Sequence, residues 1–89
     1  MISRASSGFW RAFERLPSHV QAKAREAHAQ WLQNPRHPSL QFKKVHDRYN
    51  IFSVRVDLHW RALCTKDADV LIWFWIGTHD DYERILSQI

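Results

Sequence analysis

Cysteine and long apolar runs are scarce in this chain of 89 residues. Its single cysteine, Cys64, excludes an internal disulfide and any zinc site that needs several thiolates. The longest apolar run, Val70 to Ile76, has seven residues, whereas a membrane-spanning helix needs about 20. The opening residues also lack the apolar core of a secretory signal. These absences favour a cytoplasmic protein in a reducing environment, without membrane association.

Metal-binding spacings are missing as well. The chain has six histidines, but no HxxxH or HExxH pair occurs among them. The sequence therefore predicts no metal site and no cofactor. Cys64 stands among alternating apolar residues, so its thiol is expected to be buried and inert.

Apolar residues and positive charge are abundant. Hydrophobic residues make up 45% of the chain, which is too many for a disordered protein, and the length allows one core, so residues 1–89 are predicted to form a single domain. The net charge is +4, and the basic residues gather in the middle of the chain: Arg36, Lys43, Lys44, Arg48, Arg55 and Arg61. This clustering indicates either a surface that faces a polyanion or an ordinary solvated face.

The first half of the chain predicts two helices. The serines at 6–7 can cap a first helix, which Pro17 ends. Ser18, followed by Gln21, has the pattern of a capping box at the start of a second helix, which is expected to stop at 34–35. That helix carries one apolar stripe at helical spacing: Val20, Ala24, Ala27 and Trp31.

The second half predicts strands and a last helix. Strands are expected at 40–45, 51–57, 59–64 and 70–76, the last of them central and buried on both faces. Gly77 is expected to let the chain turn sharply, and "THDD" then caps a short helix. The fold class is therefore α+β: an N-terminal helical hairpin packed on a small twisted antiparallel sheet, with a short C-terminal helix.

The ordered segments together resemble the RelE/ParE superfamily of bacterial toxins, which belong to type II toxin–antitoxin systems. The resemblance rests on "LP-SHVQAKA", "NPRHPSLQFKKV", "YNIFSVRV", "HWRAL" and "FWIGTHDDYERIL", and it runs from about Phe9 to Leu86. It implies a helical hairpin against a twisted antiparallel sheet. Many members have a first strand before the helices, and here only "MISRAS" can supply it, so that strand is expected to be short or absent.

The resemblance implies a toxin whose activity is one of two kinds. RelE-like members cleave messenger RNA in the ribosomal A site, whereas ParE-like members inhibit DNA gyrase without RNase chemistry. A ribosome-dependent endoribonuclease is the leading hypothesis. A gyrase inhibitor, or a non-toxic module that only binds a partner, is the alternative. Each of these readings implies a cognate antitoxin protein as partner.

Metal-free RNA cleavage needs a proton donor or acceptor and cations that hold the phosphate. A histidine side chain can give or take a proton near neutral pH, and the resemblance matches His79 to a C-terminal histidine of RNase members. Arg61 likewise matches an arginine that contacts the scissile phosphate, although an ion pair with Asp57 would also explain it. If the 57–59 turn has three residues, Arg55 becomes the cross-strand neighbour of Arg61, which favours a phosphate site.

Five further residues are candidates for RNA binding. Lys43 and Lys44 face opposite sides of a strand, so only one of them can line a cleft. Arg48 would add positive charge beside them. His59 is either a second acid or base or an ordinary turn residue, and Tyr82 either stacks on a base or belongs to the core.

Overall fold

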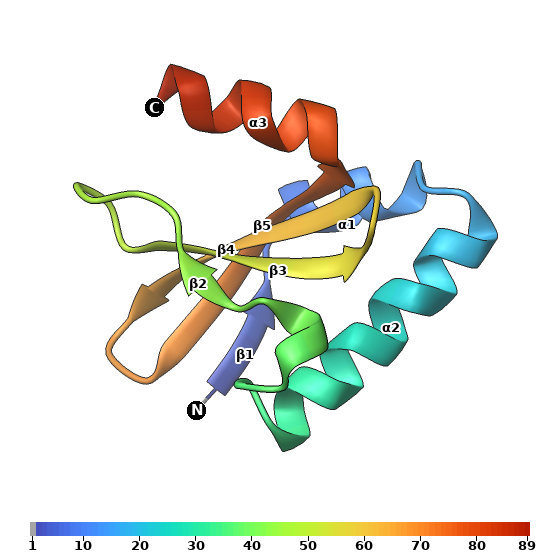
Figure 1. The fold of residues 1–89 in the computed structure, drawn as a ribbon, viewed down its shortest axis with the longest axis horizontal. Coiled ribbons are helices and arrows are strands. Elements are labelled where there is room, and N and C mark those ends of the chain that lie inside the picture. Colours follow the sequence, from blue (N-terminus) through green and yellow to red (C-terminus); the bar gives the residue numbers. More distant parts are fainter. Residues whose placement is uncertain (1) are drawn as a thin grey trace.

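A five-stranded mixed sheet, with helices on both sides, forms the computed structural model, which describes residues 2–89 (Figure 1). The elements follow one another as β1 (Ile2–Ala5), α1 (Ser7–Glu14), α2 (Ser18–Gln33), the 3-10 turn η1 (Pro38–Leu40), β2 (Lys43–Lys44), β3 (Ile51–Asp57), β4 (Trp60–Asp67), β5 (Val70–Thr78) and α3 (His79–Gln88). The α+β class, with a helical hairpin before the sheet and a short helix after it, is confirmed.

The strands lie in the order β1-β5-β4-β3-β2. The pairs β2–β3, β3–β4 and β4–β5 are antiparallel, as predicted, but β1 adds to β5 in parallel and makes the sheet mixed. The leading strand is thus present and short, and Met1 lies outside the described residues. The strand expected at 40–45 is reduced to β2, because η1 takes up Leu40.

The central strand is β4, so the prediction that the apolar run 70–76 forms it is wrong. β5 lies one place from the edge, with only the short β1 outside it. The run is apolar because both faces of β5 meet a hydrophobic cluster, although Ile72 remains 37% exposed.

The helix starts agree with the sequence at α1 and differ at α2. Ser6 caps α1, where its Oγ accepts the N–H of Phe9 at 3.2 Å. The expected cap by Ser18 is wrong, since Pro17 holds the N-cap position and no side chain caps the helix. Gln21 instead donates its amide N–H to the carbonyl oxygens of two residues at the end of α1, Phe13 and Leu16. It therefore links the helices of the hairpin rather than closing a capping box.

Two hydrophobic clusters lie on opposite faces of the sheet. The larger one joins the hairpin to the sheet and includes Phe13, Val20, Trp31, Val54, Ala62, Cys64, Leu71, Trp73 and Ile76. The smaller one joins α3 to the other face and contains Ile51, Leu63 and Tyr82, with Phe74, Trp75, Ile85 and Leu86 packed against it. Because α3 meets only part of that face, Arg55 and Arg61 there remain partly exposed, whereas Ser53 is buried beneath Tyr82.

A bulge in β5 determines which of the two clusters its side chains join. Cys64 pairs with Trp73 and Leu63 pairs with Trp75, so Phe74 has no partner on β4. In a regular strand, residues two apart share a face. The extra residue instead sends Trp73 into the hairpin cluster and Trp75 into the α3 cluster.

Gly77 continues β5 and does not form the sharp turn expected of it, since the strand runs on to Thr78. The reason for a glycine is the indole of Trp75. A Cβ atom at position 77 would lie 2.5 Å from Cζ2 and 2.9 Å from Cη2 of that ring. Glycine is thus needed for close approach to a side chain and not for an unusual backbone conformation.

Cys64 is fully buried in the hairpin cluster. Burial raises the pKa of its thiol to about 12. At neutral pH the thiol is therefore protonated and unreactive, as expected for a small core residue.

Candidate functional site

The turn between β3 and β4 meets the start of α3 at one end of the sheet (Figure 1). At this end Trp60 pairs with Thr78 and Arg61 pairs with Gly77. The N–H of His79 donates to the carbonyl oxygen of His59 at 2.7 Å. Residues from the turn, from β4 and from α3 are thus brought together, although they are far apart in the sequence.

His79 is the first residue of α3 and remains accessible, with 40% of its side chain exposed. Thr78 caps the helix, and its Oγ1 accepts the N–H of Asp81 at 3.1 Å, as the "THDD" pattern predicts. The imidazole lies against the ring of Tyr82, and its Nε2 is 3.4 Å from Oε1 of Glu83. This contact is at the surface, since 61% of the Glu83 side chain is exposed.

Arg55 and Arg61 are direct cross-strand partners, as predicted, but the assumed three-residue turn is wrong: only Leu58 and His59 separate β3 from β4, and a bulge at Val56 brings the two arginines opposite each other. Nη1 of Arg61 donates to the carbonyl oxygens of Asp57 at 2.6 Å and Trp60 at 3.0 Å. Partial burial, and then the nearby charge of Arg55, lower the pKa of Arg61. Within residues 2–89, neither guanidinium forms an ion pair with a carboxylate.

The alternative ion pair between Arg61 and Asp57 is not formed. The Asp57 carboxylate accepts the N–H of His59 at 2.8 Å, and its other oxygen is 3.4 Å from Nζ of Lys23 on α2. Arg61 meets only the backbone of Asp57. The two arginines therefore lie together without a carboxylate of the described chain in ion-pair contact, although Asp57 and Glu83 are close enough to act on the charge of Arg61.

The register decides between the two lysines of β2. Lys43 pairs with Ser53, which alternation places on the same face as Arg55, whereas Lys44 pairs with Phe52 of the hairpin face. Lys43 is therefore the lysine on the face of the arginine pair. Arg48 lies in the exposed loop that joins β2 to β3.

The two remaining candidates have structural contacts. Tyr82 is only 6% exposed and donates its hydroxyl to Ser53 Oγ at 3.5 Å, so its ring belongs to the core and has no free face for a base. His59 is exposed in the turn, where its carbonyl oxygen accepts the N–H of His79. His46 also serves the backbone, because its Nδ1 accepts the N–H groups of Arg48 and Tyr49.

Sequence reasoning missed two residues beside these groups. Glu83 is four residues after His79, a spacing that puts both on one face of a helix. Asp57 stands two residues before His59, the spacing of an Asx turn, but it was considered only as a partner for Arg61. Both signals were readable from the sequence.

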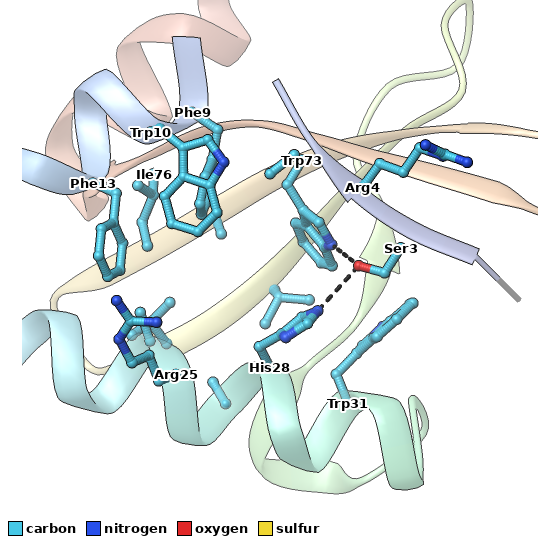
Figure 2. Close-up of a pocket in the computed structure, with 16 residues that line it drawn as sticks. Ser3, Arg4, Phe9, Trp10, Phe13, Arg25, His28, Trp31, Trp73 and Ile76 are labelled. Carbon is cyan, nitrogen blue, oxygen red and sulfur yellow. Dashed lines mark hydrogen bonds between the residues drawn. The ribbon is translucent and has the colours of Figure 1, made fainter. Parts of the chain in front are cut away.

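A separate cavity of about 350 Å³ lies between the hairpin and the sheet. It is lined mainly by apolar side chains, and the guanidinium of Arg25 lies 5.0 Å above the ring of Phe13. Figure 2 shows Ser3 between two rings: its Oγ accepts the N–H of Trp73 Nε1 at 2.8 Å and is 3.0 Å from Nε2 of His28. This cavity is on the opposite face from the arginine pair.

Other features of the chain bear on what it can bind. Among the helices of residues 2–89, none is long and apolar enough to cross a membrane. The same residues bring no three metal-binding side chains together.

Several solved structures share this fold. YafQ from E. coli is 12% identical and has a TM-score of 0.72, over 90% of this chain and 94% of YafQ. The RelB–RelE antitoxin–toxin complex from Methanococcus jannaschii gives 14% identity and a TM-score of 0.69, over 92% of this chain and 96% of the other. The RelBE2 toxin–antitoxin complex from Mycobacterium tuberculosis gives 18% identity and a TM-score of 0.69, over 88% of this chain and 96% of the other.

The fold is therefore that of the toxins of toxin–antitoxin systems with the RelE, YafQ and ParE architecture. The sequence profile of the ParE-like toxin domain matches residues 18–84. The chain belongs to this family. No curated protein sequence matches the chain at a significant level.

Proposed function

We propose that the chain is a toxin that cleaves messenger RNA on the ribosome. The observation that carries the proposal is the register pairing of Arg55 with Arg61 at the end of the sheet where His79 is bonded to His59. Two guanidinium groups without a carboxylate partner and one accessible imidazole lie at this end of the sheet. Cleavage of RNA without a metal requires such a combination.

Each group has a role that its chemistry supports. The arginine pair holds the scissile phosphate and stabilises the negative charge that grows on it in the transition state. The imidazole of His79 transfers one of the two protons, either from the attacking ribose 2′-hydroxyl or to the leaving 5′-oxygen. Lys43 continues the positive charge along the same face, where it can contact the next phosphate.

A cognate antitoxin is the proposed protein partner. Two of the related structures are complexes of a toxin with its antitoxin. The net charge of +4 favours an acidic segment of the antitoxin, lying over the helices or added beside the sheet.

Gyrase inhibition is the second candidate, because the family profile is that of a ParE-like domain. In this reading the chain only binds its target, and the imidazole of His79 is dispensable. Pulse labelling after induction separates the candidates: an RNase stops protein synthesis first, and a gyrase inhibitor stops DNA synthesis first. A chain without any effect on growth would be a partner-binding module.

The direct test is cleavage by the purified protein of a message engaged on ribosomes. We expect cuts in the A-site codon, with a rate at least about 100-fold lower for His79→Ala. His19→Ala is a matched control, because His19 is exposed on α2 and makes none of the contacts described for the site. Full activity of His79→Ala would remove the imidazole from the reaction.

A further inference from the structure

The β3–β4 turn contacts both candidate catalytic groups through its backbone. The carbonyl oxygens of Asp57 and Trp60 accept hydrogen bonds from the guanidinium of Arg61. The carbonyl oxygen of His59 accepts a hydrogen bond from the backbone N–H of His79. In Figure 1 this turn, at the end of the yellow strand β3, lies beside the start of α3. Residues 57–60 therefore set how far the guanidinium lies from the imidazole.

The side chain of Asp57 determines the shape of this turn. Its Oδ1 accepts the N–H of His59 at 2.8 Å, which closes an Asx turn. Burial would raise the pKa of Asp57, but the His59 hydrogen bond and the Lys23 ammonium outweigh it and hold this pKa below its ordinary value. Val56, the residue before it, has no partner on β4, so the strand pairing alone does not fix the turn.

We infer that Asp57 is a positioning residue of the site: its carboxylate fixes the turn, and the turn sets the geometry of Arg61 and His79. The catalytic consequence rests on the proposed function, whereas the structural consequence does not. Asp57 does not act on the substrate directly. Its carboxylate is held by Lys23 on α2 and by the N–H of His59, in a hollow between α2 and β3 that Arg55 also lines.

Substitutions at position 57 separate the hydrogen bond from the charge. Asp57→Asn keeps an oxygen that accepts the His59 N–H but loses the charge. Asp57→Glu keeps the charge, and its longer side chain still reaches Lys23, but the extra methylene moves the carboxylate out of the turn. Lys23→Ala removes the ion pair alone and serves as the control for α2.

We expect Asp57→Asn and Lys23→Ala to cleave ribosome-bound message within about threefold of the wild-type rate. Asp57→Glu should lower the single-turnover rate by about 10- to 100-fold, which is the usual effect of a displacement near 1 Å. Its KM should change little, because the lysine and arginine side chains that bind RNA are unaltered. A merely destabilising substitution would instead lower the active fraction, and Asp57→Asn would not restore the rate.

Amide hydrogen exchange provides a readout that does not depend on activity. The N–H of His79 is held by the carbonyl of His59, so its exchange should be at least about 10-fold faster in Asp57→Glu and unchanged in Asp57→Asn. Wild-type exchange and wild-type cleavage in Asp57→Glu would overturn the inference. Impairment of Asp57→Asn would overturn it too, even if Asp57→Glu failed to fold. If the wild-type chain cleaves no message, the proposed function fails, and the exchange rates still decide the role of Asp57.

Discussion

Arg55 and Arg61 lie opposite each other on adjacent strands, which costs electrostatic free energy until an anion binds between them. The two carbonyl bonds of Arg61 use only its Nη1, and a guanidinium has five N–H donors. The remaining donors can hold two oxygen atoms of a phosphate. Arg61 is thus held in place by the backbone and still has N–H groups free to bind an anion.

Substitution of Arg61 tests this double role. We expect Arg61→Lys to cleave message about 10-fold more slowly and Arg61→Ala at least about 100-fold more slowly, because lysine keeps the charge but not the fork. Arg84→Ala is the matched control, since Arg84 is exposed on α3 and pairs with Asp81. Urea unfolding of each variant checks that the fold persists. A wild-type rate in Arg61→Ala would contradict the assignment.

Near the end of β5, the side chain of one residue packs against the backbone of another residue of the same strand. The indole of Trp75 lies over Gly77, and Gly77 is the register partner of Arg61. The packing of Trp75 on Gly77 is therefore in direct contact with the strand pair that positions Arg61. A substitution that displaces the indole is expected to disturb both the α3 cluster and the position of Arg61.

Gly77→Ala should lower the free energy of unfolding by about 1–3 kcal/mol, because the added methyl overlaps the ring of Trp75. Gly8→Ala is the matched control. A Cβ there has no atom closer than Ser6 Oγ at 3.7 Å, and α1 gains a better helix former, so about 0.5–1 kcal/mol of added stability is expected. Urea unfolding followed by tryptophan fluorescence measures both changes. Equal stability of Gly77→Ala and wild type would show that the ring moves aside without cost.

Contacts between distant parts of the chain hold the N-terminal strand. β1 pairs with β5, and Ser3 joins His28 of α2 to Trp73 of β5 (Figure 2). Burial lowers the pKa of His28. The hairpin, the first strand and the sheet are therefore linked through an imidazole that burial keeps neutral to a lower pH than usual.

Acidification should weaken this link. In the unfolded chain His28 binds a proton near its ordinary pKa of about 6.5, whereas in the folded chain it does so only at lower pH. The unfolded state thus gains protons first, and the free energy of unfolding falls as the pH drops below about 6.5. Urea unfolding at pH 7.5 and 5.5 measures the fall, which should be smaller in His28→Gln. An equal fall in both proteins would exclude this histidine as the cause.

Much of the fold was predictable because it depends on local pattern. The helical stripe of α2 and the alternation of β3 are periodic in the sequence, and the Thr78 cap follows from the residues of one turn. The parallel addition of β1 was not predictable, because four residues carry too little pattern to specify a partner 68 residues away. The role of Gly77 was also hidden, since it depends on where the bulge directs Trp75.

The candidate site was predictable only in part. The pairing of Arg55 with Arg61 was predicted from an assumed three-residue turn, whereas it results from a two-residue turn and a bulge at Val56 that the sequence does not reveal. The choice of Lys43 over Lys44 required the register of β2, which has only two residues. The burial of Tyr82 depends on how α3 lies on the sheet, and a helical stripe alone does not distinguish a core tyrosine from one beside a cleft.

The unpaired Phe74 makes β5 two short strands of opposite parity. Before it the odd-numbered residues Leu71 and Trp73 face the hairpin, and after it the even-numbered Ile76 does. Deleting Phe74 would give β5 one regular alternation, with Trp73 still on the hairpin face and Trp75 still paired with Leu63 on the face of α3. Counting residues by odd and even therefore gives the wrong face for every position beyond the bulge, including the two that lead into His79.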